Sequence, residues 1–294
     1  MKTIKKITIG ADPEFIIISK RRSLIRPGSI CAGQTTTSLY VNELGCDGCG
    51  TTAEIRPEPS EDPLIVVANI HDILQRRANT DSAFLEHNWH AGSYVRSSPL
   101  GGHVHIGCDS LARDRSFQRR LVAALKVHLA PLLLLVENKT QAIKRRDCGY
   151  GLATDYRVQV YGIEYRFPSS WVTSPYVAAA VLTLSKVIAH EFINVSRSSA
   201  LPSYETTRFL PNVMYIDHIN TETIRRYIDP VWEAITKFEL YPEYSRYIDV
   251  LKFLIDNNLT WFPKCSMKEA WGIVDASTAH DTRVPVDSLW SSLE

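Results

Sequence analysis

Acidic, imidazole and guanidinium side chains occur at four points of the chain as pairs separated by one residue. The pairs are Asp12/Glu14, Glu54/Arg56, His103/His105 and Glu164/Arg166. Successive side chains of a β-strand point to opposite faces, so residues two apart share a face. A face that gathered all four pairs would be costly to bury without a ligand to balance its charges. Divalent metal ions and polyphosphate have the chemistry to balance them.

The histidine pair lies in the segment Gly101-Gly102-His103-Val104-His105-Ile106-Gly107. Glycines at both ends allow a close approach to the backbone. Two histidines on one face of an apolar strand favour contacts to a ligand or to phosphate over packing. The residues between the members of the pairs should face an apolar layer, and these are Pro13, Ile55, Val104 and Tyr165.

Each pair also has a simpler interpretation. Glu54/Arg56 and Glu164/Arg166 could form salt bridges between strands on a solvated face, and Asp12-Pro13 could form a turn. The occurrence of all four pairs in one chain favours a shared site.

Hydrophobic patterns place the pairs on strands that alternate loosely with helices. Strands are predicted at residues 7–9, 15–18, 39–41, 51–56, 103–106 and 162–167. Helices are predicted at residues 62–78, 115–137 (bent or divided at Pro131), 174–193, 223–238, 244–257 and 268–274. The pattern favours an α+β fold with a largely antiparallel sheet. We expect a catalytic core over residues 1–200 and a mainly helical part over residues 201–294, packed on the same domain.

Composition narrows the classes of function. The chain of 294 residues carries 33 Lys+Arg and 32 Asp+Glu, a formal net charge of +1, so a general basic field for nucleic acid is not indicated. Hydrophobic residues at 45% and charged residues at 22% are typical of a soluble globular protein. The most lipid-like run, residues 129–136, is far shorter than the roughly 20 residues that span a bilayer. We therefore expect a cytoplasmic protein with no membrane contact, and the oligomeric state stays open.

The six cysteines are expected to be reduced thiols. Cys46-x-x-Cys49 could be half of a zinc site with Cys31, Cys108 or Cys148, but no second pair follows at zinc-finger spacing. A glycine-rich turn between strands is the favoured interpretation of this segment.

The motifs resemble a known family when they are taken in order. They are Gly10-Ala11-Asp12-Pro13-Glu14-Phe15, Asp47-Gly48 with Ala53-Glu54-Ile55-Arg56-Pro57, the glycine-flanked histidine segment, Tyr161-Gly162-Ile163-Glu164-Tyr165-Arg166, and Ser169-Ser170-Trp171. The set is similar to the phage carboxylate–amine ligase type 2 (amidoligase) family, which is grouped with glutamine synthetase and glutamate–cysteine ligase by a shared catalytic fold. The resemblance covers residues 8 to 195 and does not extend beyond residue 200.

This resemblance implies an ATP-dependent enzyme that uses Mg²⁺ or Mn²⁺ to phosphorylate a carboxylate, after which an amine displaces phosphate and leaves an amide. It implies an antiparallel sheet curved into a funnel, with nucleotide entering at one end and the acid and amine at the other. Glu14, Glu54 and Glu164 match the family's strand carboxylates and are expected to be metal ligands. His103 or His105 would complete a metal site or touch the ATP phosphates.

The resemblance also assigns catalytic roles to arginines. Arg166 would face the phosphates or the acyl phosphate, Arg56 is a second candidate, and Arg157 matches a position that meets phosphate or the substrate carboxylate. Asp12 is expected to join Arg157 and Arg166 in binding the nucleotide and its metal.

Two assignments stay open. Arg145-Arg146 either adds to the phosphate site or forms a solvated helix end, and Asp47 is either a turn residue or a catalytic one. The acid and the amine are expected to be small molecules or peptides, in the host cytoplasm if the protein is encoded by a phage.

Two other functions compete with the ligase. A metal-dependent hydrolase could use the His-x-His and carboxylate cluster, although the regular (β/α)₈ pattern of barrel amidohydrolases is missing. A non-catalytic phage protein could also retain the fold. Activity that requires ATP separates the ligase from the hydrolase, and binding of ATP and Mg²⁺ separates it from the non-catalytic protein.

Overall fold

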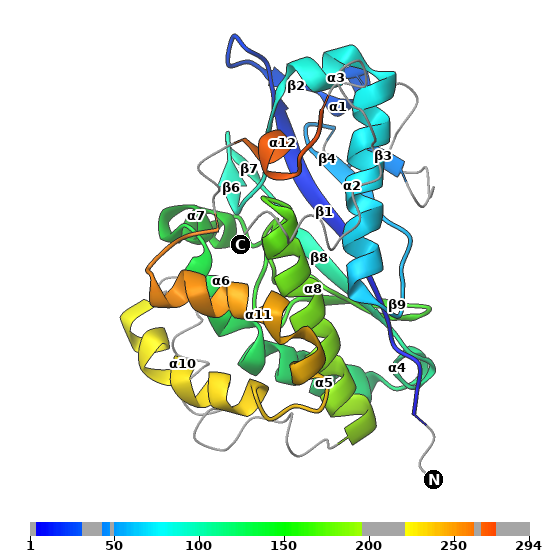
Figure 1. Cartoon of the computed structure of the whole chain (residues 1–294), viewed down its shortest axis with the longest axis vertical. Helices are drawn as coiled ribbons and strands as arrows, with labels where there is room; N and C mark the ends of the chain where they lie inside the picture. Colours follow the sequence, from blue (N-terminus) through cyan, green and yellow to red (C-terminus); the bar gives the residue numbers. More distant parts are fainter. Residues whose placement is uncertain (1–3, 31–42, 48–49, 196–220, 262–265, 275–294) are drawn as a thin grey trace.

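A twisted antiparallel sheet crosses the molecule, and helices α2 and α8 lie on one side of it (Figure 1). The computed structural model describes residues 4–30, 43–47, 50–195, 221–261 and 266–274. The main path of the sheet runs β3-β4-β1-β8-β10-β9, and β2 and β5 pair along the far part of β1. These strands are β1 (Thr8–Ile18), β2 (Leu24–Ile25), β3 (Glu43–Cys46), β4 (Ala53–Arg56), β5 (Asn88–His90), β8 (Gly102–Gly107), β9 (Tyr156–Gln159) and β10 (Gly162–Tyr165), and a separate hairpin joins β6 (Tyr94–Val95) to β7 (Ser98–Pro99). The predicted α+β class with a largely antiparallel sheet is confirmed.

Strand β1 lies between β4 and β8 in the sheet and carries the first polar pair. It runs without a break through Asp12-Pro13, so the prediction of two separate strands, and the alternative of a turn at this point, are wrong. Pro13 lacks an N–H group and lies opposite Gly102. Backbone hydrogen bonding resumes at Glu14, whose N–H donates to Gly101 O at 2.8 Å.

The helices begin and end close to the predicted residues. They are α1 (Pro27–Ile30), α2 (Pro63–Thr80), α3 (Ser82–Glu86), α4 (Asp109–Arg113), α5 (Arg115–His128), α6 (Ala130–Val136), α7 (Lys139–Asp147), α8 (Pro175–His190) with the π-helical turn η1 (Glu191–Val195), α10 (Thr221–Ile235), α11 (Tyr241–Asp256) and α12 (Met267–Ala270). Asp62 caps α2 by accepting from Leu64 N–H, and Ser174 caps α8 by accepting from Val177 N–H. The predicted helix 115–137 is divided at Leu129, just before Pro131.

Some elements were not predicted, and one prediction is not tested. Strand β9 and helix α7 were absent from the sequence prediction, although both contribute to the site. The strand predicted at residues 39–41 lies outside the described residues.

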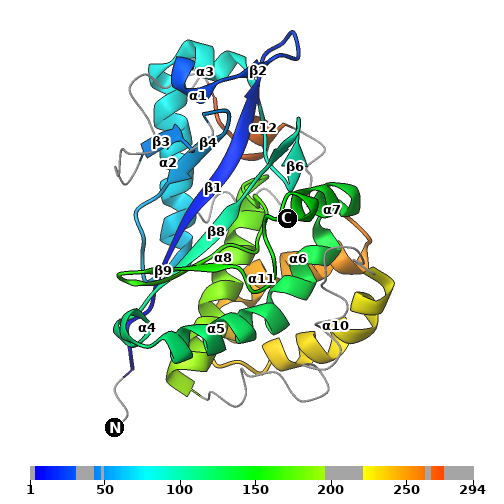
Figure 2. The ribbon, with the colours of Figure 1, turned by 180° about the vertical axis from the view of Figure 1, so that it is seen from behind.

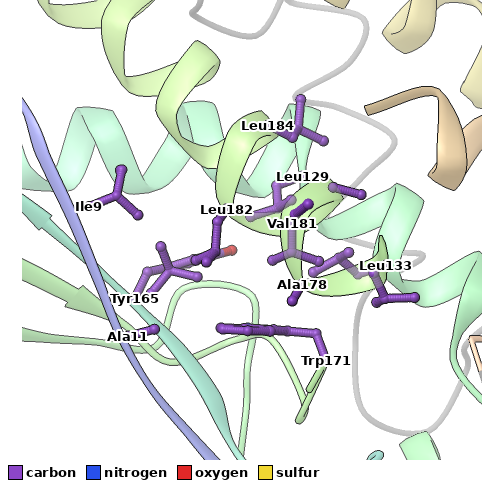
Figure 3. Close-up of a cluster of buried hydrophobic side chains, with 14 of the residues drawn as sticks. Ile9, Ala11, Leu129, Leu133, Tyr165, Trp171, Ala178, Val181, Leu182 and Leu184 are labelled. Atoms are coloured by element: carbon purple, nitrogen blue, oxygen red, sulfur yellow. The ribbon is translucent and has the colours of Figure 1, made fainter. Parts of the chain in front are cut away.

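The core lies between the sheet and α8 (Figure 3). Ile55, Val104 and Tyr165, the residues between the members of three polar pairs, are each 0% exposed. They face the apolar layer as predicted, and Pro13 between Asp12 and Glu14 is also buried. The alternation of the strands therefore places the polar pairs together on the opposite face, which lies in front of α2 and α8 in Figure 2.

Helix α8, continued by η1, is also the most apolar long helix of the described chain. By length and composition alone, Pro175–Val195 could cross a membrane, and 94% of its most apolar window is buried inside the protein. The core helices of soluble proteins pass the same test, so the feature is weak evidence for a membrane span. From the sequence, only the shorter run at residues 129–136 was considered lipid-like, and this helix was not considered.

The described residues after position 220 are mainly helical. Helices α10 and α11 pack on α5, α6 and α8, and α12 packs near β5. We retain as a proposal the division into a catalytic core of residues 1–200 and a helical part of residues 201–294, because its boundary lies outside the described residues.

Candidate active site

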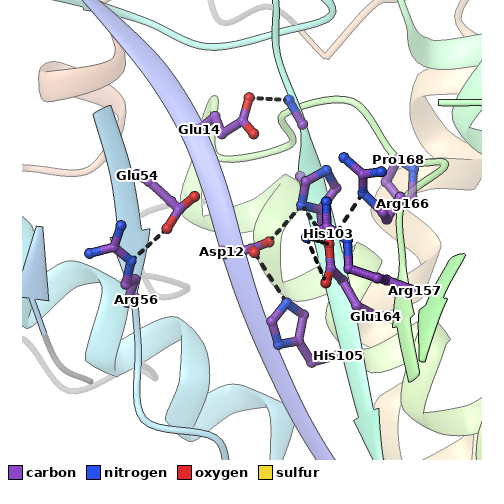
Figure 4. A network of polar contacts seen from close by, with 12 residues as sticks. Asp12, Glu14, Glu54, Arg56, His103, His105, Arg157, Glu164, Arg166 and Pro168 are labelled. Carbon is purple, nitrogen blue, oxygen red and sulfur yellow. Dashed lines mark hydrogen bonds and ion pairs between the residues drawn. The ribbon is translucent and has the colours of Figure 1, made fainter. Parts of the chain in front are cut away.

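The four polar pairs converge because their strands are consecutive neighbours in the sheet. In the register, Glu14 lies opposite Glu54, Asp12 opposite His103, and His105 opposite Glu164. Figure 4 shows the side chains of these pairs gathered on one face. Arg166 comes one residue after the end of β10 and still reaches the same face, where its Nε lies 3.2 Å from Glu164 Oε1.

Asp12, His103 and Glu164 form one candidate metal site, here called the histidine group. Each offers a ligand atom, and these atoms lie within 4.8 Å of one another. His103 Nδ1 is 3.0 Å from Asp12 Oδ1 and 3.5 Å from Glu164 Oε1. All three atoms are buried, and none has a partner in hydrogen-bond geometry. Glu164 Oε1 also lies 3.2 Å from a nitrogen of Arg157 and from one of Arg166. A bound cation would complete this set of buried atoms.

The second histidine of the pair stands beside this group. His105 Nε2 lies 3.3 Å from Asp12 Oδ2. Burial by itself lowers the pKa of His105, but the charge and hydrogen bond of Asp12, together with the charges of Glu164 and Glu54, raise it above its usual value. Burial by itself raises the pKa of Asp12, but His103 and His105 together bring it well below its usual range. Asp12 is therefore an ionised carboxylate between two imidazoles.

Glu14, Asp47 and Glu54 form a second candidate metal site, here called the carboxylate group, whose ligand atoms also lie within 4.8 Å of one another. Burial and the charge of Asp47 raise the pKa of Glu14 well above its usual value. Burial and the charge of Asp12 raise the pKa of Glu54 to about 7, against the attraction of Arg56. Three carboxyl groups this close repel one another when ionised, and a divalent cation would relieve that repulsion. The structure thus places Asp47, which the sequence left open, among the acidic residues of the site.

Glu164 is surrounded by donors from the neighbouring strand. Arg157, opposite it on β9, lies 3.2 Å from Glu164 Oε1, and the Gln159 Nε2 group donates to Oε2 at 2.8 Å. Glu164 is only 2% exposed. The alternative of a salt bridge on a solvated face is therefore wrong for Glu164/Arg166, whose two side chains belong to one strand segment rather than to two strands.

Arg56 is less free to act than its sequence position implied. Its Nε lies 2.5 Å from Glu54 Oε1, and its Nη2 donates to Cys46 O at 3.1 Å. The guanidinium lies over Gly45, where a Cβ would overlap it. In this structure Arg56 balances the charge of Glu54 and links β4 to β3 through its hydrogen bond to Cys46 O.

Two tyrosines that were not predicted as site residues contact the histidines. The Tyr150 hydroxyl donates to Glu14 Oε1 at 3.0 Å and lies 2.7 Å from His103 Nε2. The Tyr161 hydroxyl lies 2.7 Å from His105 Nδ1, and the two rings stack with centroids 5.8 Å apart. Gly101 leaves room for this arrangement, because a Cβ there would overlap both His103 and the Tyr150 hydroxyl. The only sequence signal for Tyr150 was its position between two glycines.

Arg145 and Arg146 are buried at the end of α7, so the solvated helix end considered for them is wrong. Arg145 donates to Phe167 O at 2.8 Å and to Pro168 O at 3.0 Å, and its guanidinium packs on the Tyr150 ring at 4.6 Å. Burial lowers the pKa of Arg145 to about 10, which still leaves it charged at neutral pH. Arg145 therefore positions the backbone of residues 167–168 and the ring of Tyr150.

Among the described residues, no cysteine belongs to either candidate metal site. Cys46 and Cys108 are buried and Cys148 is exposed, while Cys31, Cys49 and Cys265 lie outside the described residues. Next to Cys46, the Asp47 N–H donates to Thr52 O at 2.9 Å between the antiparallel strands β3 and β4. This contact fits the turn that was favoured over a zinc site.

Comparison with known proteins decides the family. The model of the family described as phage phiEco32-like COOH.NH2 ligase-type 2 matches residues 9–273. The chain belongs to this family. It is therefore a carbon–nitrogen ligase, an enzyme of the class that forms amides from a carboxylate and an amine. The match reaches well past residue 200, so the expectation that the family resemblance ends there is wrong.

The solved structures that are similar to the chain share little sequence with it. The ligand-free form of GmaS has 13% identity and a TM-score of 0.49, with 88% of this chain and 72% of that chain covered. A glutamine synthetase from Plasmodium falciparum has 13% identity and a TM-score of 0.41, with 84% and 74% covered. No curated protein matches the sequence of the ligase.

Proposed function

We propose that the ligase uses ATP and a divalent cation to activate a substrate carboxylate as an acyl phosphate, which an amine then converts to an amide. The observation that carries this proposal is the placement of the histidine group and the carboxylate group on one face of neighbouring strands, within a chain of the ligase family.

The residues of both groups fit divalent cations. Glu14, Asp47 and Glu54 offer only carboxylate oxygens, the ligands that Mg²⁺ prefers. Asp12 and Glu164 add an imidazole nitrogen from His103, a set that also suits Mn²⁺. Divalent cations held there would supply charge neutralisation and alignment for a triphosphate. Only His103 has a nitrogen within a candidate site, so we assign it, and not His105, as the metal ligand.

The contacts of two arginines support a role on the transferred phosphoryl group. Arg157 and Arg166 both contact Glu164, at the edge of the histidine group. Burial by itself lowers the pKa of Arg166, but Tyr150, Asp155 and Glu164 outweigh it and raise the pKa above the usual value. A planar cation that keeps its charge can form paired hydrogen bonds to phosphate oxygens. We assign Arg166 and Arg157 to the phosphates of the nucleotide and of the acyl phosphate.

The nucleotide is proposed to enter beside Tyr161. A cavity of about 730 Å³ lies at this end of the sheet, and its lining includes Tyr161 and the cationic residues Lys5, Lys6 and Arg113. Tyr161 also contacts His105, which borders Asp12. A nucleotide in this cavity would direct its phosphates toward the histidine group, and the acid and the amine would approach from the side of Glu14 and Glu54.

The reaction balances with these parts. A carboxylate oxygen of the acid attacks the γ-phosphorus of ATP, and the bond from that phosphorus to the bridging oxygen breaks, so ADP leaves. The amine nitrogen then attacks the acyl carbon and loses a proton, and phosphate leaves with the oxygen that came from the acid. Phosphoryl transfer of this kind depends on positioning and charge neutralisation, for which the polar face supplies the side chains.

A screen of acid–amine pairs tests the proposal. Phosphate release is measured with ATP and Mg²⁺, and mass spectrometry detects products lighter than the sum of acid and amine by one water. We expect release to require both substrates with the wild type, to be abolished in Glu164→Gln, and to persist in Glu233→Gln, which removes an exposed glutamate of α10. Hydrolysis of substrates without nucleotide, or full activity of Glu164→Gln, would contradict the proposal.

A further inference from the structure

The phenol of Tyr150 stands between the two candidate metal sites and is held on several sides. Its hydroxyl contacts Glu14 of the carboxylate group and His103 of the histidine group. Its ring meets the His103 ring edge to face, with centroids 5.7 Å apart. The guanidinium groups of Arg145 and Arg166 lie 4.6 Å and 5.3 Å from its centroid. The position of the hydroxyl is therefore set by packing as well as by hydrogen bonds.

The hydrogen bonds of this hydroxyl determine where His103 carries its proton. A phenol has one proton to donate. Glu14, as the carboxylate that binds a cation, can only accept, and its Oε2 already accepts from the Gly101 N–H at 2.7 Å. The Tyr150 proton therefore goes to Glu14 Oε1. The 2.7 Å contact to His103 Nε2 then requires the imidazole to be the donor, with its proton on Nε2.

A histidine that ligates a cation is neutral, because its ligand nitrogen must be deprotonated. A neutral imidazole with its proton on Nε2 has a free lone pair on Nδ1. In this protein Nδ1 is the atom that faces Asp12 Oδ1 and Glu164 Oε1. Two carboxylate oxygens and an imidazole lone pair are three acceptors, and in the structure none of the three has a partner in hydrogen-bond geometry. Arg157 and Arg166 each place a nitrogen 3.2 Å from Glu164 Oε1, and a cation among the three acceptors would also satisfy Nδ1 and Asp12 Oδ1.

We propose that Tyr150 is a positioning residue whose hydroxyl fixes His103 in the Nε2–H form, so that Nδ1 joins Asp12 and Glu164 as a ligand of a divalent cation. The inference rests on the proposed function, because it takes Glu14 as a ligand carboxylate, and it adds a residue and a ligand atom to that function. Histidines that bind metals usually donate their other N–H to a nearby acceptor, which fixes the tautomer. Here a phenol is that acceptor, and Glu14 orients it.

The local backbone is built to place this phenol. Gly149 and Gly151, on either side of Tyr150, have φ of 74° and 75°, the left-handed conformation that side chains other than glycine rarely adopt. A Cβ on Gly151 would overlap the Arg145 guanidinium on which the Tyr150 ring packs. The loop thus brings the hydroxyl to the two groups.

The test compares Tyr150→Phe with a matched control. Tyr165→Phe also removes a phenolic hydroxyl from the sheet region, one that donates to Ala153 O at 2.9 Å on the opposite, apolar face. Binding of Mn²⁺ is measured by calorimetry without nucleotide. The tautomer of His103 is read from its ¹⁵N ring resonances with Mg²⁺ present, assigned by their loss in His103→Gln.

We expect the wild type and Tyr165→Phe to carry the His103 proton on Nε2 and to bind Mn²⁺ equally well. We expect Tyr150→Phe to bind Mn²⁺ about tenfold to a hundredfold more weakly and to lose the preference for Nε2–H. A substitution that changed only the stability of the fold would leave His103 in the Nε2–H form, as we expect for Tyr165→Phe.

Each contrary result has its own meaning. If Tyr150→Phe keeps both affinity and tautomer, the role of Tyr150 is overturned and the proposed function stands. A proton on Nδ1 of the Mg²⁺-bound wild type overturns the inference without any variant. If the wild type binds neither cation, the proposed function falls together with the inference.

Discussion

Ionisation of Glu54 should lower the stability of the ligase in the absence of divalent cations as the pH rises, and Glu54→Gln should remove that effect. Burial and the charge of Asp12 raise the pKa of Glu54 from 4.5 to about 7, although Arg56 opposes them. The folded protein therefore binds this proton more tightly than the unfolded chain does. The stabilisation from the proton is fully present below the unfolded pKa and is lost as the pH rises through the folded pKa.

The size of the effect follows from the same values. The pKa difference of about 2.5 units corresponds to about 3–4 kcal/mol, at about 1.4 kcal/mol per unit. Part of the loss occurs below about pH 5, so about 2–3 kcal/mol should be lost between about pH 5 and about pH 8. The Glu54 side chain is only 13% exposed, so screening by solvent should leave most of this energy.

Urea unfolding in EDTA, followed by circular dichroism across this pH range, measures the effect. The wild type should lose about 2 kcal/mol more of its free energy of unfolding than Glu54→Gln between the two ends. Mg²⁺ at the alkaline end should restore stability to the wild type far more than to the variant, because ligand binding to the folded state stabilises it. Equal pH slopes for the two proteins would refute the account of Glu54 as a buried carboxyl in a crowded acidic group.

Three further substitutions test other parts of the site. His103→Ala should weaken Mn²⁺ binding and ATP turnover at least about tenfold more than His105→Ala, because only His103 belongs to a candidate metal site; equal effects in calorimetry and kinetics would contradict this. Arg157→Ala should lower ATP turnover while changing the free energy of unfolding by less than about 1 kcal/mol, because this side chain is 59% exposed; unchanged turnover would remove it from the site. Gly151→Ala should cost about 1–3 kcal/mol in thermal unfolding, because it combines a left-handed φ with overlap on Arg145, and an unchanged Tm would show that the loop adapts freely.

The alternation of strands allowed the polar face to be predicted from sequence. Because residues two apart share a face, the spacing alone assigns the pair Glu164/Arg166 and the intervening Tyr165 to opposite sides of the sheet. The burial of Tyr165 and the contact between Glu164 and Arg166 agree with that assignment. That the four strands are neighbours is a long-range property of the chain, for which periodicity holds no signal, and only the family resemblance pointed to it.

The parts that were missed depend on tertiary contacts. Helix α7 ends in charged residues, so its sequence resembles an exposed helix, yet Arg145 is buried because the carbonyls of residues 166–168 accept its hydrogen bonds. Tyr150 reaches Glu14 across 136 positions of sequence, which no local pattern predicts. The strand through Asp12-Pro13 was missed because proline usually interrupts a ladder, whereas here the neighbouring residues maintain the pairing with β8.

Diffraction from crystals soaked with Mn²⁺ and a non-hydrolysable ATP analogue tests the central claim most directly. The account predicts anomalous peaks at both groups, one among Asp12, His103 and Glu164 and one among Glu14, Asp47 and Glu54, with the triphosphate beside them. Manganese bound elsewhere, or a triphosphate away from this face of the sheet, would contradict it.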